Sequence, residues 1–272
     1  MATHGFSQLD VFTARPMLGN PLAVIHDADD LDGATMQRVA NWTNLSETTF
    51  LLPPDDGADY GLRIFTPTRE LPFAGHPTLG SCQAWLDAGG QPANETILQY
   101  CAAGLIPIRR DGTRLAFRAP PLIRSGPIAD ELRLRLPDCL GIPAQAIAQT
   151  AWIDNGPGWI GVLLRDVADL RAIRPHYPAF AGMKLGVIAP ASDQDYDIEL
   201  RAFTGAYEDP VTGSLNASAA QWLFALGLVR SDYVAAQGMA LGRSGRVHVA
   251  KEGNDIWVGG QVLSCVRGQI TL

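Results

Sequence analysis

The chain has 272 residues, which is long for one compact core and suits two. With 47% hydrophobic and 18% charged residues and a net charge of −7, it is neither a disordered chain nor a nucleic-acid binder of the usual basic kind. It has no apolar run of the roughly 20 residues that span a bilayer, and no signal-peptide pattern at its N-terminus. We therefore expect a cytoplasmic protein with no nucleic-acid or membrane partner.

The first half of the chain shows strand and helix patterns in alternation. We expect a strand at 22–25, a helix through Met36, Val39, Ala40 and Thr43, an apolar helix at 79–86 closed by Gly89, and strands at 97–108 and 115–118. A Pro-rich stretch at 119–127 then indicates a linker.

The second half shows a similar series. We expect a strand at 161–164, an apolar run ended by proline at 185–190, an apolar helix at 217–226 closed by Gly227, and strands at 246–250 and 256–258. Many short strands around few helices favour an α+β fold in which each half wraps a curved sheet around a central helix. A doubly wound parallel sheet fits less well, because helices do not alternate with buried strands.

A gapless internal repeat explains this similarity. Residues 63–76 align with residues 201–214 at a constant offset of 138, and Arg, Phe, Thr, Glu, Pro and Gly coincide. The offset is about half the chain, which predicts two pseudo-symmetric copies of one domain. We place them at 1–118 and 119–272, with the option that a last strand at about 262–272 packs back on the first.

Both repeated turns end where a helix is expected to begin. Pro77 stands near the first helical position and Ser214 is a candidate N-cap. Gly75 and Gly213, just before the helices, leave the backbone open to a ligand. Because free N–H groups at a helix N-terminus bind anions, we expect a carboxylate ligand in a cleft between the two halves.

Three reactive side chains occur in one copy of the repeat only, and these are Glu47, His76 and Asp209. Their counterparts at the same offset are Leu185, Ser214 and Leu71. Residues that the shared architecture does not require suit a single asymmetric substrate. A carboxylate such as Glu47, at the head of a strand in a partly dry cleft, has a raised proton affinity and can work as a general acid or base.

Cysteines and histidines argue against a metal site. The four cysteines form no Cys-x-x-Cys pair and the five histidines form no His-x-x-x-His pair. We therefore expect reduced, mostly buried thiols and no metal. The segment 156–161 fits Gly-x-Gly-x-x-Gly, but a strand follows it rather than a helix, which argues against a dinucleotide site.

Several ordered motifs resemble the PhzF-like phenazine-biosynthesis family. They lie at 10–13, 19–24, 44–48, 65–78, 208–214 and 259–261. The resemblance covers nearly the whole chain and implies the diaminopimelate-epimerase-like fold, in which each of two similar domains is a β-barrel-like sheet around a central helix. It also implies that the acid/base glutamate is Glu47 and that the other polar site residues are His76, Asp209 and Ser214.

The resemblance further implies an isomerase that needs no metal or organic cofactor and forms a homodimer. The member that gives the family its name moves a proton between ring positions of trans-2,3-dihydro-3-hydroxyanthranilate. We therefore expect Glu47 to shuttle a proton, with His76 and Asp209 orienting or protonating a polar group of a small, carboxylate-bearing, cyclic substrate. The candidate substrate-binding residues are Ser214, Gly75, Gly213, Asn20 and Ser46.

Two other functions stay open at this point. Epimerases and racemases of the same fold use two cysteines near the helix starts, whereas this chain has His76 and Ser214 there and Cys82 further along. That difference argues against a two-thiol racemase, but an amino-acid epimerase or lyase of another design remains. The third possibility is a binding protein that keeps the carboxylate site without turnover.

Overall fold

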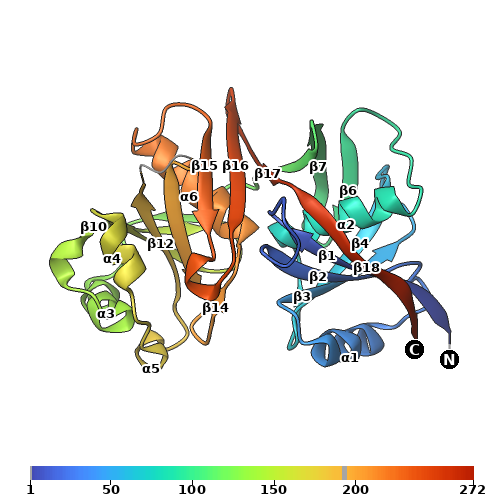
Figure 1. Cartoon of the computed structure of the whole chain (residues 1–272), viewed down its shortest axis with the longest axis horizontal. Helices are drawn as coiled ribbons and strands as arrows, with labels where there is room; N and C mark the ends of the chain where they lie inside the picture. Colours follow the sequence, from blue (N-terminus) through green and yellow to red (C-terminus); the bar gives the residue numbers. More distant parts are fainter. Residues whose placement is uncertain (1, 192–194) are drawn as a thin grey trace. The chain divides into compact units, whose positions relative to one another are not determined.

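The computed structural model describes residues 2–191 and 195–272, which form two compact units. The first unit comprises Met1–Arg118 and Gly259–Leu272, and the second comprises Ala119–Val258. The last strand therefore belongs to the first unit. It pairs there with the first strand, and the two ends of the chain lie side by side (Figure 1).

The first unit is a single curved sheet with two helices. Its elements are β1 (Thr3–Val11), β2 (Asn20–Ile25), α1 (Gly33–Thr43), β3 (Glu47–Leu52), β4 (Tyr60–Phe65), β5 (Glu70–Leu71), α2 (Gly75–Asp87), β6 (Ile97–Cys101), β7 (Gly104–Asp111), β8 (Arg114–Arg118) and β18 (Val262–Thr271). The strand order is β18-β1-β2-β3-β4-β6-β7-β8, with β5 on the edge of β4.

The second unit has the same plan with more helices. Its elements are β9 (Arg124–Gly126), α3 (Asp130–Leu140), η1 (Ala144–Ala146), β10 (Ile147–Asp154), β11 (Trp159–Leu164), α4 (Val167–Ala172), α5 (Tyr177–Phe180), β12 (Lys184–Pro190), β13 (Ile198–Phe203), β14 (Glu208–Asp209), α6 (Gly213–Ala225), β15 (Tyr233–Gln237), η2 (Met239–Leu241), β16 (Gly245–Glu252) and the part of β17 (Asp255–Gly260) that ends at Val258. Its strand order includes β9-β10-β11-β12-β13-β15-β16, with β14 on β13.

The repeat seen in the sequence holds in three dimensions. Helices α2 and α6 begin 138 residues apart and have 13 residues each. The parallel pairs β2–β3 and β4–β6 of the first unit correspond to β11–β12 and β13–β15 of the second. The turn before each helix is also the same, since Thr66 N–H bonds to the Arg69 carbonyl as Thr204 N–H bonds to the Tyr207 carbonyl.

Each unit surrounds one central helix with strands (Figure 1). Most residues of α2 are buried, because it contacts β1, β2, β3, β8 and β18. Helix α6 is buried in the same way by β10, β11, β12 and β16. The packing leaves no room at Gly80, where an added Cβ would lie 2.5 Å from a methyl group of Leu22. Such helices must be apolar or small on every side.

The outer face of each sheet is covered as well. In the first unit, Met36 and Val39 of α1 join a cluster with Ile25 and Phe50. In the second unit, α3, α4 and α5 cover the corresponding face in a larger cluster that includes Phe180. Apolar residues therefore pack against both faces of each sheet.

Three details differ from the sequence-based expectations. The stretch 97–108 is the hairpin of β6 and β7, in which Gly104 adopts a φ of 93°. The Pro-rich stretch 119–127 is not only a linker, because β9 pairs with β10. Helix α3 was not expected, since Leu132, Leu134 and Leu136 alternate as in a strand and Pro137 follows them.

The described part of the chain lacks two features, a membrane-spanning helix and a metal-binding cluster. None of its helices is long and apolar enough to cross a bilayer. Nor do three or more metal-ligating side chains gather anywhere within it. All four cysteines are free, with Cys82, Cys101 and Cys139 buried and Cys265 exposed.

Candidate functional site

The first polar cluster lies where two parallel strands and the central helix of the first unit begin. Asn20 is the first residue of β2 and Glu47 is the first residue of β3. The parallel register sets Glu47 beside Leu22, so both strand starts are at the same edge. Helix α2 begins at Gly75, and its second residue, His76, reaches both strand starts.

His76 is the centre of this cluster. Its Nε2 lies 3.4 Å from Oε2 of Glu47, and its Nδ1 lies 3.4 Å from Nδ2 of Asn20. His76 is 3% exposed, Asn20 is fully buried, and the Glu47 side chain is 16% exposed. His76 therefore contacts two other predicted site residues, Glu47 and Asn20, in surroundings that exclude most water.

Burial keeps the imidazole of His76 neutral. It lowers the pKa of His76 from 6.5 to about 3, although a hydrogen bond with the backbone of Pro21 acts in the opposite direction. The contact with Glu47 is thus not an ion pair at neutral pH but a carboxyl group facing a neutral ring. Such a ring can either give or accept a hydrogen bond, which suits proton transfer better than a fixed cation does.

Local structure fixes both strand starts. The Asp10 carboxylate accepts the Gly19 N–H with both oxygens at 3.1 Å, which sets the turn before Asn20. An added Cβ at Gly19 would lie 2.2 Å from a backbone oxygen, so only glycine fits. Asn44 ends α1 in the left-handed region, with φ 53°, and the half-buried Ser46 stands in the short turn between it and Glu47.

We expect the burial of His76 to make the protein less stable in acid. The folded pKa lies below the unfolded one, so between about pH 6.5 and pH 3 the unfolded chain takes up a proton that the folded chain refuses. The free energy of unfolding should therefore fall as the pH drops through this window and be unaffected above it. Urea unfolding at several pH values measures the slope, which His76→Gln should flatten.

A second histidine provides the control for that measurement. His176 is exposed, so His176→Gln should leave the acid-side slope as in the wild type. Equal slopes for the wild type and His76→Gln would show that another group causes the acid sensitivity.

The second polar cluster lies at the start of α6. Asp209 ends β14, Thr212 is the N-cap, and Gly213 and Ser214 are the first two helical residues. Ser214 is therefore not the N-cap that the sequence suggested, because the helix begins one residue before it. Likewise α2 begins at Gly75, so Pro77 is its third residue and both glycines lie inside their helices.

Ser214 is held by two side chains that the sequence analysis did not single out. Its Oγ accepts a hydrogen bond from Nε1 of Trp159 at 3.1 Å, and its carbonyl accepts one from Nδ2 of Asn155 at 2.9 Å. Ser214 is 8% exposed. Trp159 starts β11 in the second unit as Asn20 starts β2 in the first. The equivalent position in the repeat therefore could have indicated Trp159 as a site residue.

Asp209 is also held by neighbours that the sequence analysis missed. The Thr212 hydroxyl donates a hydrogen bond to Oδ2 of Asp209. Gln237, at the end of β15, bonds to both the Asp209 carbonyl and Thr212. The sequence does contain a signal for Gln237, which stands 138 residues after Gln99, the same offset as the repeat.

Both central helices begin without a side-chain cap. Ala74 has no capping group, and the Thr212 side chain makes no bond to the helix N–H groups. The first N–H groups of a helix have no partner within it and favour negative charge. Each helix start, with a glycine as its first residue, is therefore suited to an anionic group of a ligand.

Cys82 does not fit a thiol-based mechanism. It lies on α2 and is fully buried, and burial raises the pKa of its thiol to about 12. Since the thiolate is the reactive form, Cys82 stays a protonated core residue at neutral pH.

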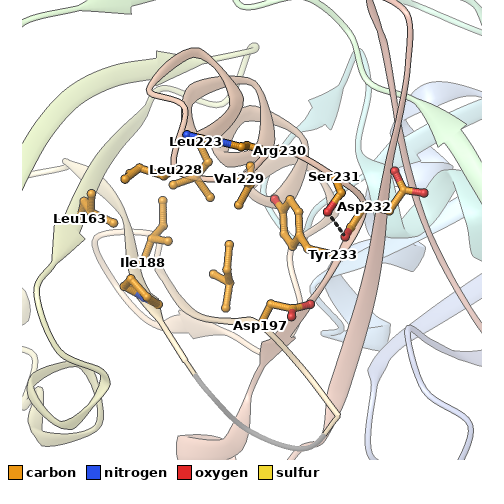
Figure 2. Close-up of a pocket in the computed structure, with 12 residues that line it drawn as sticks. Leu163, Ile188, Asp197, Leu223, Leu228, Val229, Arg230, Ser231, Asp232 and Tyr233 are labelled. Carbon is orange, nitrogen blue, oxygen red and sulfur yellow. Dashed lines mark hydrogen bonds between the residues drawn. The ribbon is translucent and has the colours of Figure 1, made fainter.

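The second unit also has a cavity of about 290 Å³ at the far end of α6 (Figure 2). Leu163, Ile188 and Leu223 give it a mainly apolar wall. Its two carboxylates are engaged with the backbone, Asp197 with Val234 N–H and Asp232 with Lys251 N–H. Carboxyl, imidazole and hydroxyl groups gather instead at the starts of α2 and α6.

The Gly-x-Gly-x-x-Gly segment is the turn of a β-hairpin. It joins the antiparallel strands β10 and β11, and Oδ1 of Asp154 accepts the N–H groups of Gly156 and Gly158. A side chain of the turn thus occupies the N–H groups that would bind phosphate in a dinucleotide site.

Comparison with known proteins finds relatives that match nearly the whole chain. A family model described as "Phenazine biosynthesis-like protein" matches residues 9–265. "Antisense-enhancing sequence 1" of Schizosaccharomyces pombe is 34% identical over 99% of each chain. "Trans-2,3-dihydro-3-hydroxyanthranilate isomerase" of Pseudomonas aeruginosa is 32% identical over 92% of this chain and 91% of its own.

Solved structures show the same fold. A PhzF-family protein of Bacillus anthracis has a TM-score of 0.85 at 21% identity, with 100% of both chains covered. A hydroxyproline epimerase of Agrobacterium vitis has a TM-score of 0.61 at 15% identity, covering 99% of this chain and 93% of its own. This likeness confirms the expected α+β fold, in which a curved sheet surrounds a central helix.

Proposed function

The chain belongs to the phenazine biosynthesis-like protein family and is an isomerase, and we propose that it moves a proton within a small, carboxylate-bearing, cyclic substrate of the dihydro-hydroxyanthranilate type. The observation that carries this proposal is the contact of 3.4 Å between Glu47 and a buried, neutral His76. This pair can take up and return a proton without a cofactor, and we propose that none is used.

Glu47 is the proposed acid/base group. A carboxylate at the edge of a buried cluster is poorly solvated, which strengthens it as a base toward a weakly acidic C–H group. After it removes a proton from one ring position, the protonated carboxyl group can return the proton at another. His76 and Asn20 would hold Glu47 and a polar substrate group in line during both steps.

The helix starts are the proposed carboxylate contacts. N–H groups at Gly75 and Gly213 would bind substrate oxygens, with Ser214 donating a further hydrogen bond and Ser46 lying beside the substrate. Asp209 would orient or protonate a polar group of the ring. We propose that one substrate binds the residues of both clusters. We further propose that the protein is a homodimer that binds a small molecule and has no nucleic-acid or membrane partner. Light scattering of the purified protein tests the oligomeric state.

Solvent exchange tests the proposed reaction. The protein is incubated in D₂O with dihydro-hydroxyanthranilate and analogues, and deuterium at the ring carbons is followed by NMR. We expect deuterium incorporation together with isomerisation. In Ser214→Ala we expect a KM about tenfold higher than that of the wild type, because the loss of one hydrogen bond to a charged group has roughly that effect. Inversion of an amino acid in the same assay would favour an epimerase instead. Tight carboxylate binding without exchange would favour a binding protein.

A further inference from the structure

A fully buried glutamine links Asp209 to the start of α6. Gln237 is 0% exposed, and its amide has four hydrogen-bond partners. Its Oε1 lies 3.0 Å from the Thr212 backbone nitrogen and 3.0 Å from Nδ2 of Asn216. Its Nε2 lies 3.1 Å from the Asp209 carbonyl oxygen and 3.0 Å from Oγ1 of Thr212.

Two backbone groups determine which way round this amide lies. A backbone N–H only donates, so the Gln237 atom that faces Thr212 N must be the oxygen. A backbone carbonyl only accepts, so the atom that faces the Asp209 carbonyl must be the nitrogen. The flipped amide would oppose two donors, Thr212 N–H and Nδ2 of Asn216, at one end and the Asp209 carbonyl at the other.

The orientation of the amide determines the direction of the next hydrogen bond. Because Nε2 of Gln237 donates to Oγ1 of Thr212, that oxygen is an acceptor on this side, and its own hydrogen must point elsewhere. The other partner in reach is Oδ2 of Asp209. Asn216 supports the arrangement, since its Nδ2 donates to Oε1 of Gln237 and to the Thr212 carbonyl at 2.9 Å.

We propose that Gln237 is a positioning residue that makes the Thr212 hydroxyl a permanent donor to Asp209. This donor favours the ionised form of Asp209 and ties it to the N-cap residue of the helix on which Ser214 lies. This inference rests on the proposed function for its effect on turnover, but not for the direction of the hydrogen bonds. In the reaction, a fixed carboxylate orients a substrate hydroxyl or amino group and does not compete for the proton that Glu47 moves.

The first unit has a matched glutamine, Gln99, whose chain of hydrogen bonds ends on a different group. Gln99 is also 0% exposed, and its Nε2 donates to Oγ1 of Thr78 at 3.2 Å. The Thr78 hydroxyl then donates to the Ala74 carbonyl at 2.9 Å. The same glutamine–threonine device therefore holds the start of α2, but it ends on the backbone rather than on a carboxylate.

The charged groups around Asp209 include Glu208, Arg201 and Arg243. Glu208 pairs with Arg201 at 2.7 Å, and both are buried. Arg243 lies on the turn after β15, where the space at Gly238 is bounded by its Cβ and by the Pro210 carbonyl. Neutral substitutions at Thr212 and Gln237 leave all three charges in place, so changes at Asp209 report on the hydrogen bonds.

The test is the titration of Asp209, which needs no substrate. Aspartate carboxyl carbons are labelled with ¹³C, and the Asp209 signal is assigned by its loss in Asp209→Asn. We expect Thr212→Val to raise the titration midpoint by about one unit, and Thr212→Ser to stay within about 0.3 unit, since serine keeps the donor. Gln237→Met should raise the midpoint in the wild type but add nothing in the Thr212→Val background, because Gln237 acts through Thr212.

Gln99→Met is the matched control and should leave the Asp209 midpoint unchanged. The inference is overturned if folded Thr212→Val titrates as the wild type does, or if Gln237→Met acts equally in both backgrounds. If Gln237→Met does not fold, the comparison of Thr212→Val with Thr212→Ser still decides the direction of the bond. A shifted titration with unchanged turnover would leave this inference standing and remove Asp209 from the proposed function.

Discussion

Glu47→Gln is expected to lower turnover by about 10²- to 10⁴-fold, the usual contribution of a positioned acid or base. Glutamine fills the same space and can still contact Nε2 of His76, but it cannot take up a proton from carbon. Substrate binding should change little, so the loss should appear in kcat rather than in KM. Deuterium exchange into the substrate in D₂O should slow by the same factor, since exchange requires the same proton removal.

The matched control for this variant is Glu70→Gln in the same unit. Glu70 pairs with Arg63, and its side chain is 38% exposed, so its substitution removes a carboxylate without touching the cluster. Turnover should stay within about twofold of the wild type, as is usual for an exposed ion pair. If Glu47→Gln turns over and exchanges as fast as the wild type, Glu47 is not the acid/base group.

The repeat is the part of the fold that the sequence predicts most directly. Six identical residues at one offset are enough to pair the turns and central helices of the two units, because a shared turn requires the same residues twice. The offset also separates structural residues from reactive ones. Arg63 and Arg201 both hold a glutamate seven residues later, whereas Glu47 and His76 have no chemical equivalent in the second unit.

Hydrogen-bond direction is the part of the site that the sequence does not predict. Gln237 is a polar residue at the end of an apolar strand, a position typical of a solvated side chain, but in the structure it is fully buried. The sequence predicts Ser214 as the N-cap, because serine caps helices well, whereas the structure has Thr212 at that position. The Thr212 hydroxyl does not cap the helix because it donates to Asp209, a contact that exists only after β14 and α6 have folded together.

Arg201→Ala is expected to lower the free energy of unfolding by about 3–5 kcal/mol, the usual effect of leaving one partner of a buried ion pair alone. Arg201 and Glu208 are 7% and 5% exposed and share two hydrogen bonds, of 2.9 and 2.7 Å. Arg201 also donates to the carbonyls of Leu170 and Ile173, which would each lose one hydrogen bond. Denaturant unfolding of the purified variant measures the loss.

The other copy of the repeat supplies the control, because Arg63 and Glu70 form the same two-bond pair at 33% and 38% exposure. Water compensates both charges there, so Arg63→Ala should cost only about 0.2–1 kcal/mol. Equal losses at the two positions would mean that burial does not decide the strength of this pair. The difference matters for function, because the Arg201 pair anchors the strand that ends at Asp209, whereas Leu71 stands at that place in the first unit. The stronger anchor is therefore in the unit where the turn presents a carboxylate.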